Sequence, residues 1–407
     1  MTFLLENRKE MINMKHDFDE YVNRRGTECK KYSEEIFHKD VIPMWIADTD
    51  FKAPKPVVDA LTARMAEGVY GYPPVSNRLY AAVVRWEKVR FGWNIPDCAV
   101  EYVPGVIGGI ISAVRALSRP GDNIVIQSPC YPPFKDLAEH NGRHLLRNKM
   151  LLKEGSYHID FQDLESKLKD NRTKLFILCN PQNPTGRVFT QEELVRIGEL
   201  CLKYHVIVLA DEIHCDIVYQ GQTHIPFGSL REDFGMNSIT FINPSKTFNL
   251  PGFRTAAMIC LSPILKSAVH DVIVNNKAIG ENICGTLALC TAYESCDYYA
   301  DQLVEYLQQN KEYLERALKD IKEIRVIPAQ GTYLLWLDCR NLLMSQTELV
   351  TFFKDQVKIG LNDGASFGPD GIGFMRINIG CTKKTLEEAV VRIKNALNMR
   401  SRGGALC

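Results

Sequence analysis

Lys246 is the residue whose position in the chain first indicates chemistry. The apolar run Ser238–Ile242 before it is typical of a buried strand, and Thr255–Cys260 after it predicts another. Lys246 therefore lies on a loop that leaves the end of a strand, where an amine can be partly removed from water. A desolvated amine loses its proton more readily and can then form a Schiff base with an aldehyde. Most lysines are solvated surface charges, so other residues must support this interpretation.

Two further strand ends carry polar side chains that complement such an amine. Asn183 follows the apolar run 175–178, and Asp211 follows the apolar run 206–210. Strands that alternate with helices at this spacing predict right-handed crossovers and a mainly parallel sheet. Ligands of such sheets bind beyond the carboxyl ends of the strands, so the asparagine, the aspartate and the lysine are expected at one site. These are the groups that a pyridoxal phosphate site requires.

Three segments of the sequence carry a family resemblance. They are Trp-Ile-Ala-Asp-Thr-Asp-Phe at 45–51, Asp-Glu-Ile-His-Cys-Asp at 211–216 and Pro-Ser-Lys-Thr-Phe-Asn at 244–249. The chain resembles the fold-type I aminotransferase superfamily, whose cofactor is pyridoxal 5'-phosphate (PLP). Within it, the chain is similar to the MalY/PatB-type cystathionine β-lyase (C–S lyase) group. The resemblance covers residues from about 40 to about 397, and its motifs are specific only in combination.

The resemblance implies a three-layer α/β fold with a mainly parallel central sheet, plus a smaller α+β domain. We expect residues 44–284 to form the large PLP-binding domain, and residues 1–43 together with 285–407 to form the small domain. Residues 1–43 are charged and weakly patterned, which indicates an arm on a later domain. A solvated tail is an equal alternative for the first dozen residues.

The pattern changes after Cys260, as a second domain requires. A long helical stretch is expected over about 285–321. The sequence then predicts strands and helices of the small domain, namely strands near 324–327, 332–337 and 374–379 and helices near 347–357 and 382–397.

The resemblance assigns roles to the polar residues around Lys246. Lys246 would bond the cofactor aldehyde and later act as general base. Asp211 would keep the pyridine nitrogen protonated, because a nearby carboxylate favours the charged form. Asn183 would hydrogen-bond the phenolic oxygen of the ring. His214 stands where many aminotransferases carry a tyrosine that contacts this oxygen, so a direct contact and a satisfied structural histidine both stay open.

Two tyrosines are expected at the cofactor. Tyr131 follows the apolar run 123–127 in a proline-rich turn, and the matching family tyrosine lies flat on the pyridine ring. It is also a candidate to protonate a departing group. Tyr72 lies in a turn-rich loop, and the matching family tyrosine reaches across a dimer interface to the partner's cofactor phosphate. A homodimer is therefore expected, although either tyrosine could instead be a packing residue.

A glycine-rich turn is the first candidate for binding the phosphate group. Gly105, Val106 and Ile107 precede an apolar helix that is expected to reach about Leu117. Small residues at a helix start let backbone N–H groups approach an anion, and the helix dipole favours its charge. Such a turn is a weak signal alone, but its position matches the family's phosphate loop.

Ser245 and Arg254 are the side-chain candidates for the same phosphate. Arg254, eight residues after Lys246, matches a common phosphate-binding arginine. A guanidinium can bind a phosphate through two parallel hydrogen bonds. Many family members carry a serine three residues before the lysine, where this chain has Asn243. This departure puts the usual side-chain contact in doubt, although an asparagine can still donate.

Arg376 is the candidate for binding substrate. It lies within Phe-Met-Arg-Ile-Asn, an otherwise apolar run that predicts a strand. A guanidinium embedded there is costly unless it finds an anion. In the family the matching arginine binds the α-carboxylate of the substrate.

Composition and charge exclude several other classes of protein. Lysine plus arginine and aspartate plus glutamate are both 49, so a general nucleic-acid binder is not expected. No apolar run of about 18 residues predicts a membrane span, and the first residues do not read as a secretory signal. The thirteen cysteines include no Cys-x-x-Cys pair, which indicates reduced thiols in a cytoplasmic protein. No metal site is predicted.

The function expected from the resemblance is PLP-dependent β-elimination on a sulfur amino acid. The substrate would be L-cystathionine or a related cysteine S-conjugate, and the products pyruvate, ammonia and a thiol. An aminotransferase that uses the same site is the first alternative. A regulatory PLP-binding protein acting through protein contacts is the second, because one member of this branch represses a sugar regulon in that way.

Overall fold

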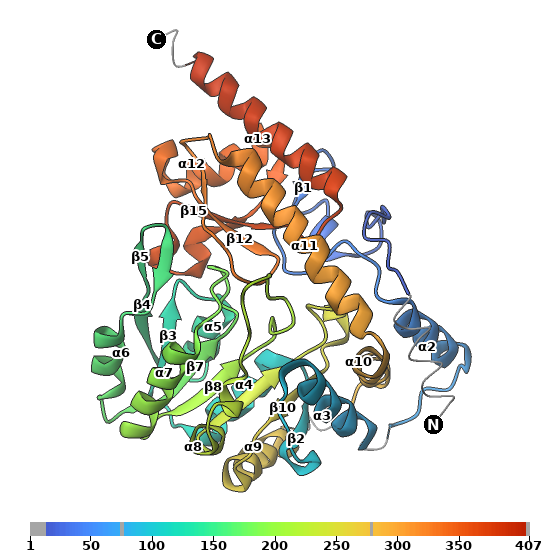
Figure 1. Ribbon diagram of the computed structural model, residues 1–407, viewed down its shortest axis with the longest axis vertical. Helices are drawn as coiled ribbons and strands as arrows, with labels where there is room; N and C mark the ends of the chain where they lie inside the picture. The colour runs from blue at the N-terminus through green and yellow to red at the C-terminus, as the bar shows by residue number, and fades with distance from the viewer. Residues whose placement is uncertain (1–13, 74–76, 277–279, 404–407) are drawn as a thin grey trace.

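A seven-stranded sheet is the centre of the computed structural model, which describes residues 14–73, 77–276 and 280–403 (Figure 1). The order along the sheet is β2, β10, β9, β8, β7, β3, β4. The strands are β2 (Val100–Val103), β3 (Asn123–Ser128), β4 (His144–Lys149), β7 (Thr173–Cys179), β8 (Ile207–Asp211), β9 (Ser238–Ile242) and β10 (Ala256–Ile259). Strand β10 pairs antiparallel with β2 and β9, whereas the other pairings in this sheet are parallel. The predicted mainly parallel sheet is therefore confirmed.

Side chains of this sheet alternate between two helical layers. In β7, Leu175 and Ile177 pack with α4 (Val106–Leu117) and α9 (Pro263–Asn275). Phe176 and Leu178 of the same strand pack with α6 (Phe161–Leu168) and α7 (Gln191–Lys203). A strand that is covered on both faces must be apolar at nearly every position, which is the pattern seen in the sequence. The expected three-layer α/β fold is confirmed.

A second, four-stranded sheet follows in the C-terminal part of the chain, in the upper half of Figure 1. Its order is β11 (Arg325–Val326), β12 (Leu334–Asp338), β15 (Phe374–Asn378) and β14 (Asn362–Asp363). The helices of this part are α10 (Ile283–Ser295), α11 (Asp297–Leu318), α12 (Gln346–Thr351) and α13 (Lys383–Gly403). This part also contains β13 (Ile359–Gly360). Further elements earlier in the chain are α2 (Lys55–Ala66), α3 (Asn77–Phe91), α5 (Pro133–Glu139), α8 (Glu232–Met236), β1 (Ile42–Pro43), β5 (Leu151–Lys153) and β6 (Ser156–His158).

Two expectations for the helices of this part need correction. The single stretch expected over 285–321 is wrong, because Cys296 leaves helical geometry with φ −119° and ψ 29° and separates α10 from α11. A one-residue break between two helices leaves hydrophobic periodicity on both sides, so the pattern did not reveal it. The helix expected over 347–357 continues after α12 as a π-helical segment, Phe352–Val357.

The described part of the N-terminal arm packs against the C-terminal part of the chain. Phe18 lies 5.2 Å from Tyr299 and 5.3 Å from Tyr306 of α11, measured between ring centroids. Strand β1 pairs in parallel with β13. The first dozen residues, for which a tail was the alternative, lie outside the described residues. The seven-stranded sheet falls within 44–284 and the four-stranded sheet within 285–407, but the division into two domains at these residues stays a prediction.

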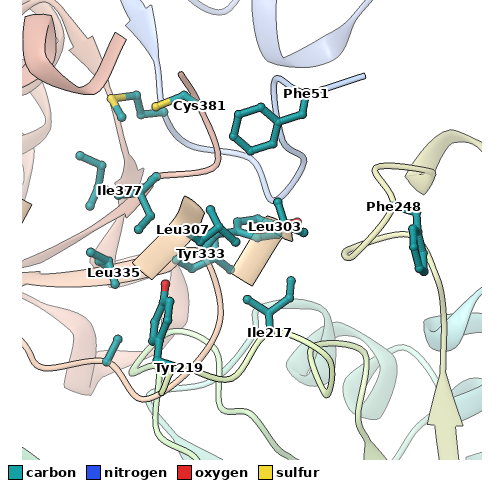
Figure 2. Close-up of a cluster of buried hydrophobic side chains, with 14 of the residues drawn as sticks. Phe51, Ile217, Tyr219, Phe248, Leu303, Leu307, Tyr333, Leu335, Ile377 and Cys381 are labelled. Carbon is teal, nitrogen blue, oxygen red and sulfur yellow. The ribbon is translucent and has the colours of Figure 1, made fainter. Parts of the chain in front are cut away.

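One large apolar cluster joins these parts around the region that carries Lys246. It includes Phe51, Ile217 and Tyr219, Phe248 two residues after Lys246, Leu303 and Leu307 of α11, and Leu335 and Ile377 of the small sheet (Figure 2). Across the described residues, no helix is both long and apolar enough to cross a bilayer.

The contact of α4 with the sheet generates a stability prediction. A Cβ placed on Gly109 of α4 would lie 2.8 Å from Cε1 of Phe241 in β9. Helix propensity alone would favour alanine by about 1 kcal/mol, but the clash outweighs it. Gly109→Ala should lower the free energy of unfolding by about 1–3 kcal/mol, measured by denaturant titration. Gly280→Ala is the control, because a Cβ there meets nothing within 4 Å; equal stability of both variants would contradict the packing described.

Candidate active site

A pocket of about 490 Å³ lies beyond the carboxyl ends of β7, β8 and β9. It brings together most of the residues that the sequence predicted for one site. These are Gly105, Val106, Ile107, Tyr131, Asn183, Asp211, His214, Ser245, Lys246 and Arg254. Segments far apart in the chain therefore meet at the edge of the sheet where ligands of such folds bind.

Lys246 lines this pocket as a half-buried amine. Its Nζ donates to the carbonyl oxygen of Ala47 at 2.7 Å. The pKa of the Lys246 amine is lowered to about 8, chiefly by burial and also by the charge of Arg376, while the charges of Asp48 and Asp211 oppose this shift. A substantial fraction of the amine is therefore neutral, and nucleophilic, near physiological pH.

Asp211, the last residue of β8, is a buried carboxyl that forms no ion pair within the described residues. It is 3% exposed, and its Oδ1 accepts a hydrogen bond from the backbone N–H of Ile213 at 3.2 Å. Burial raises the pKa of Asp211 to about 7. A protonated ring nitrogen placed beside it would favour the carboxylate form, so the residue suits a cationic heterocycle.

Arg376 lies in β15, directly behind Asn183. Its guanidinium donates to Oδ1 of Asn183 and to the carbonyl oxygen of Trp45, both at 2.8 Å. The residue is 3% exposed, its buried Nε has no hydrogen-bond partner, and burial lowers its pKa to about 10. No carboxylate among the described residues forms an ion pair with it. The arrangement is that of a guanidinium prepared for an external anion.

The bond from Arg376 also settles how Asn183 faces the pocket. Because Oδ1 of Asn183 accepts from the arginine, its amide nitrogen is the group left to act as a donor. An oxygen of a bound ring would be the complementary partner.

The N-terminus of α4 forms one wall of the pocket. Gly105 precedes it with φ +82°, a conformation that favours glycine, and no side chain caps the helix. The uncapped N–H groups of the first turn are suited to an anion. A Cβ on Gly105 would lie 3.8 Å from the carbonyl oxygen of Arg254, so these two backbone segments adjoin.

Further polar side chains line the pocket near this helix end. Ser245 is buried and Arg254 is exposed at the rim, and both line the pocket. Asn243, the residue that departs from the family pattern, also lines it. Its Oδ1 accepts from the backbone N–H of Ser245 at 2.7 Å, so it shapes the turn and keeps only its amide nitrogen for a ligand.

Two ring-bearing residues line the middle of the pocket. Tyr131 is half-buried and packs edge to face on Phe134, with centroids 5.7 Å apart. Burial raises the pKa of Tyr131, which keeps it a neutral phenol. Burial also lowers the pKa of His214 well below its usual value, and its buried Nδ1 has no hydrogen-bond partner. His214 thus faces the pocket as a neutral imidazole with an unused polar atom.

Tyr72 lies away from the pocket of its own chain. Its side chain is fully exposed, at 104% of the reference area. Within one chain it does not contribute to the site, and the predicted role across a dimer interface stays a prediction.

Sequence reasoning missed the backbone contribution of segment 45–51. Ala47 lines the pocket, and its carbonyl oxygen accepts from Lys246 and, at 3.1 Å, from the hydroxyl of Tyr333. Carbonyls of the same segment accept from Arg376 and from Asn378. A carbonyl is present in every residue, so no residue type in the sequence signals this role. Other pocket residues that were not predicted are Pro104, Gly108, Cys179, Ile213 and Pro251.

The chemistry of the pocket fits one kind of ligand. An aldehyde would meet the Lys246 amine, a protonated ring nitrogen would meet the buried Asp211, and a phosphate would meet the open end of α4. PLP carries all three groups.

Comparisons with known proteins agree with this chemistry. The family described as "Aminotransferase class I and II" matches residues 49–393. Cystathionine beta-lyase PatB of Bacillus subtilis is 39% identical over 386 residues, which cover 94% of this chain and 100% of that protein.

Two solved structures share the fold over nearly the whole chain. One is a PLP-bound putative aminotransferase from Clostridium difficile 630, with a TM-score of 0.91, 36% identity and coverage of 94% of this chain and 100% of that one. The other is the PLP-bound C-S lyase from Staphylococcus hominis, with a TM-score of 0.88, 29% identity and coverage of 95% and 99%.

The charges around Lys246 predict how its amine titrates in the cofactor-free protein. Acetylation of Lys246, followed by mass spectrometry of its peptide, should reach half its maximal rate near pH 8. Asp211→Asn should lower this midpoint, because it removes an anion that favours the charged amine. Arg376→Gln should raise it, because it removes a repelling cation. Shifts in the same direction for both variants would contradict the electrostatics described.

Proposed function

Because this chain belongs to the class I and II aminotransferase family, we propose that it binds PLP and acts as a carbon–sulfur β-lyase. Its substrates are sulfur amino acids such as L-cystathionine or related cysteine S-conjugates, and its products are pyruvate, ammonia and a thiol. The observation that carries this proposal is the 39% identity with a cystathionine β-lyase across 94% of the chain. The pocket supports it with groups that suit both the cofactor and an amino-acid carboxylate.

The pocket residues divide between holding the cofactor and handling protons. When bound, PLP supplies an electron sink for bonds broken at the amino-acid Cα. Lys246 would hold its aldehyde carbon, Asp211 its ring nitrogen and the amide of Asn183 its phenolic oxygen. The first turn of α4, Ser245 and Arg254 would hold the phosphate.

Lys246 would then act as the base that removes the Cα proton of the substrate. Its lowered pKa, about 8, places it close to the working pH, where a general base is most effective. Arg376 would bind the α-carboxylate in a charge-assisted contact and so orient the Cα–H bond. Tyr131 or Lys246 would give a proton to the departing sulfur.

Two further parts of the proposal concern the assembly and its location. Tyr72 is exposed beside Val69 and Tyr70, which are also largely exposed. We propose that this loop packs against a second copy of the chain, so that Tyr72 reaches the partner's phosphate site.

The cysteines of the described residues are free thiols, most of them buried, which supports a reducing, cytoplasmic location.

Multiple turnover separates a lyase from an aminotransferase, the alternative that the same residues would serve. With L-cystathionine and no keto acid, the holoenzyme should release many equivalents of pyruvate per site, detected with lactate dehydrogenase. Lys246→Ala should abolish this release, because it removes both the covalent anchor and the base. If pyruvate release stops at one equivalent per site, or requires an added keto acid, the protein is an aminotransferase and the lyase assignment is wrong.

Subunit mixing tests the proposed dimer. Tyr72→Ala and Lys246→Ala proteins should each be impaired, but their mixed dimer contains one site with both residues intact. Pyruvate release should therefore recover after subunit exchange, which size-exclusion chromatography of differently tagged chains can verify. Exchange without recovery would show that Tyr72 does not act across the interface.

A further inference from the structure

The segment that follows β8 has two faces, and only one of them lines the pocket. Asp211 and His214 face the pocket, whereas Glu212 and Asp216 are buried behind it. Two backbone hydrogen bonds form turns in this segment. The N–H of Cys215 donates to the carbonyl oxygen of Glu212, and the N–H of Ile217 donates to the carbonyl oxygen of His214, each at 2.9 Å. The two acids behind the pocket have no part in the proposed chemistry.

Asp216 connects two regions through its two carboxylate oxygens. Oδ2 accepts from the hydroxyl of Thr247 at 2.7 Å, and Oδ1 accepts from Nε1 of Trp86 at 3.0 Å. Thr247 directly follows Lys246, and it is 1% exposed. Burial raises the pKa of Asp216, but the charge of Arg90 and the hydrogen bonds from Thr247 and Trp86 favour its charged form. Hydrogen bonds to a charged group are the stronger kind, so this pair attaches the loop that carries the lysine.

Trp86 is a rigid donor for this attachment. It lies in α3, is fully buried and stacks on Tyr293 of α10 with centroids 4.7 Å apart and planes at 11°. Its edge also contacts Phe248, the residue after Thr247, at 5.7 Å. Asp216 is therefore held from the side of α3 and α10, independently of what occupies the pocket.

The other charged groups near Asp216 have separate partners or no charge. Glu212 accepts from the N–H of Phe227 at 2.8 Å and contacts Nε2 of His224 at 3.0 Å. Glu87 of α3 is fully buried, and neither carboxyl oxygen has a hydrogen-bond partner. Burial, and then repulsion by Glu212 and Asp216, raises the pKa of Glu87 well above its usual value, so it is a neutral acid.

Arg90 is a cation near Asp216, but its ion pair is with a different carboxylate. Its Cζ lies 5.4 Å from the ring centroid of Trp86, while its NH1 pairs with Asp301 at 2.5 Å. The described residues also include no group of acids, histidines and cysteines that could hold a metal ion. Asp216 is the acid of this cluster that reaches the lysine loop.

We propose that Asp216 is a positioning residue for Lys246. Its carboxylate, fixed by Trp86, holds the Thr247 hydroxyl and so sets the direction in which the lysine side chain enters the pocket. The far end of that side chain is set by the carbonyl of Ala47. The proposal rests on the proposed function only in giving Lys246 the catalytic role. Loss of the attachment should misplace the amine, and an error of about 1 Å can cost on the order of 100-fold in rate.

The test compares variants that alter one hydroxyl. Thr247→Val removes the donor with little change in size, and Thr247→Ser restores it. Thr173→Val is the matched control, because Thr173 is also buried and donates to the carbonyl of Lys167 at 2.8 Å, outside the pocket. In the cofactor-free protein, Thr247→Val should raise the pH midpoint of Lys246 acetylation, because a loosened amine regains water and its pKa returns toward that of an ordinary lysine.

Kinetics of the holoenzyme give the second readout. Thr247→Val should lower kcat for pyruvate release on the order of 10- to 100-fold with little change in KM, and Thr247→Ser should stay near the wild type. Asp216→Ala combined with Thr247→Val should cost no more than Asp216→Ala alone, because either change breaks the hydrogen bond between these two side chains. Thermal midpoints of Thr247→Val and Thr173→Val should fall by similar amounts.

Two outcomes would overturn the proposal. One is an acetylation midpoint in Thr247→Val equal to that of Thr173→Val and the wild type, and the other is fully additive losses in the double variant. A wild-type protein that releases no pyruvate would instead overturn the proposed function. The acetylation midpoints would still decide the positioning role in that case, because they are measured without cofactor or substrate.

Discussion

The site depends on keeping one amine partly out of water without neutralising it with a carboxylate. Nζ of Lys246 meets a backbone carbonyl, that of Ala47, at 2.7 Å, where a direct ion pair would hold the proton on nitrogen. A carbonyl orients the amine but stabilises its charge less than a carboxylate does. Burial then lowers the pKa to about 8, so the amine remains both held in place and reactive.

This constraint explains why the chain passes segment 45–51 across the pocket. Carbonyl oxygens of this segment accept hydrogen bonds from Lys246, which follows β9 of the large sheet, and from Arg376 of β15. The segment therefore links the two sheets at the site. Within this segment, Asp48 and Asp50 form ion pairs with Arg24 of the N-terminal arm at 2.7 and 2.8 Å, and Asp50 also pairs with Lys31 at 3.0 Å. A buried network of this kind holds its members in one arrangement when every partner is present.

The sequence revealed the parts of the site that depend on residue type and strand position. Buried strands are apolar at nearly every position, so their ends could be located, and the polar residues after them lie around one pocket. The role of Ala47 could not be predicted, because it uses a backbone carbonyl. The break at Cys296 was missed because helical periodicity continues on both sides of it. Tyr72 lies outside the pocket of its own chain, since the phosphate site predicted for it belongs to a second copy.

The identity of the lysine that bonds the cofactor is the central claim, and reduction with borohydride tests it most directly. The protein would be incubated with PLP, reduced, digested and analysed by mass spectrometry. The account predicts a phosphopyridoxyl group on the peptide that contains Lys246, at one equivalent per chain, and none in Lys246→Ala. A protein that carries the group on a different lysine, or takes up none, would contradict the account.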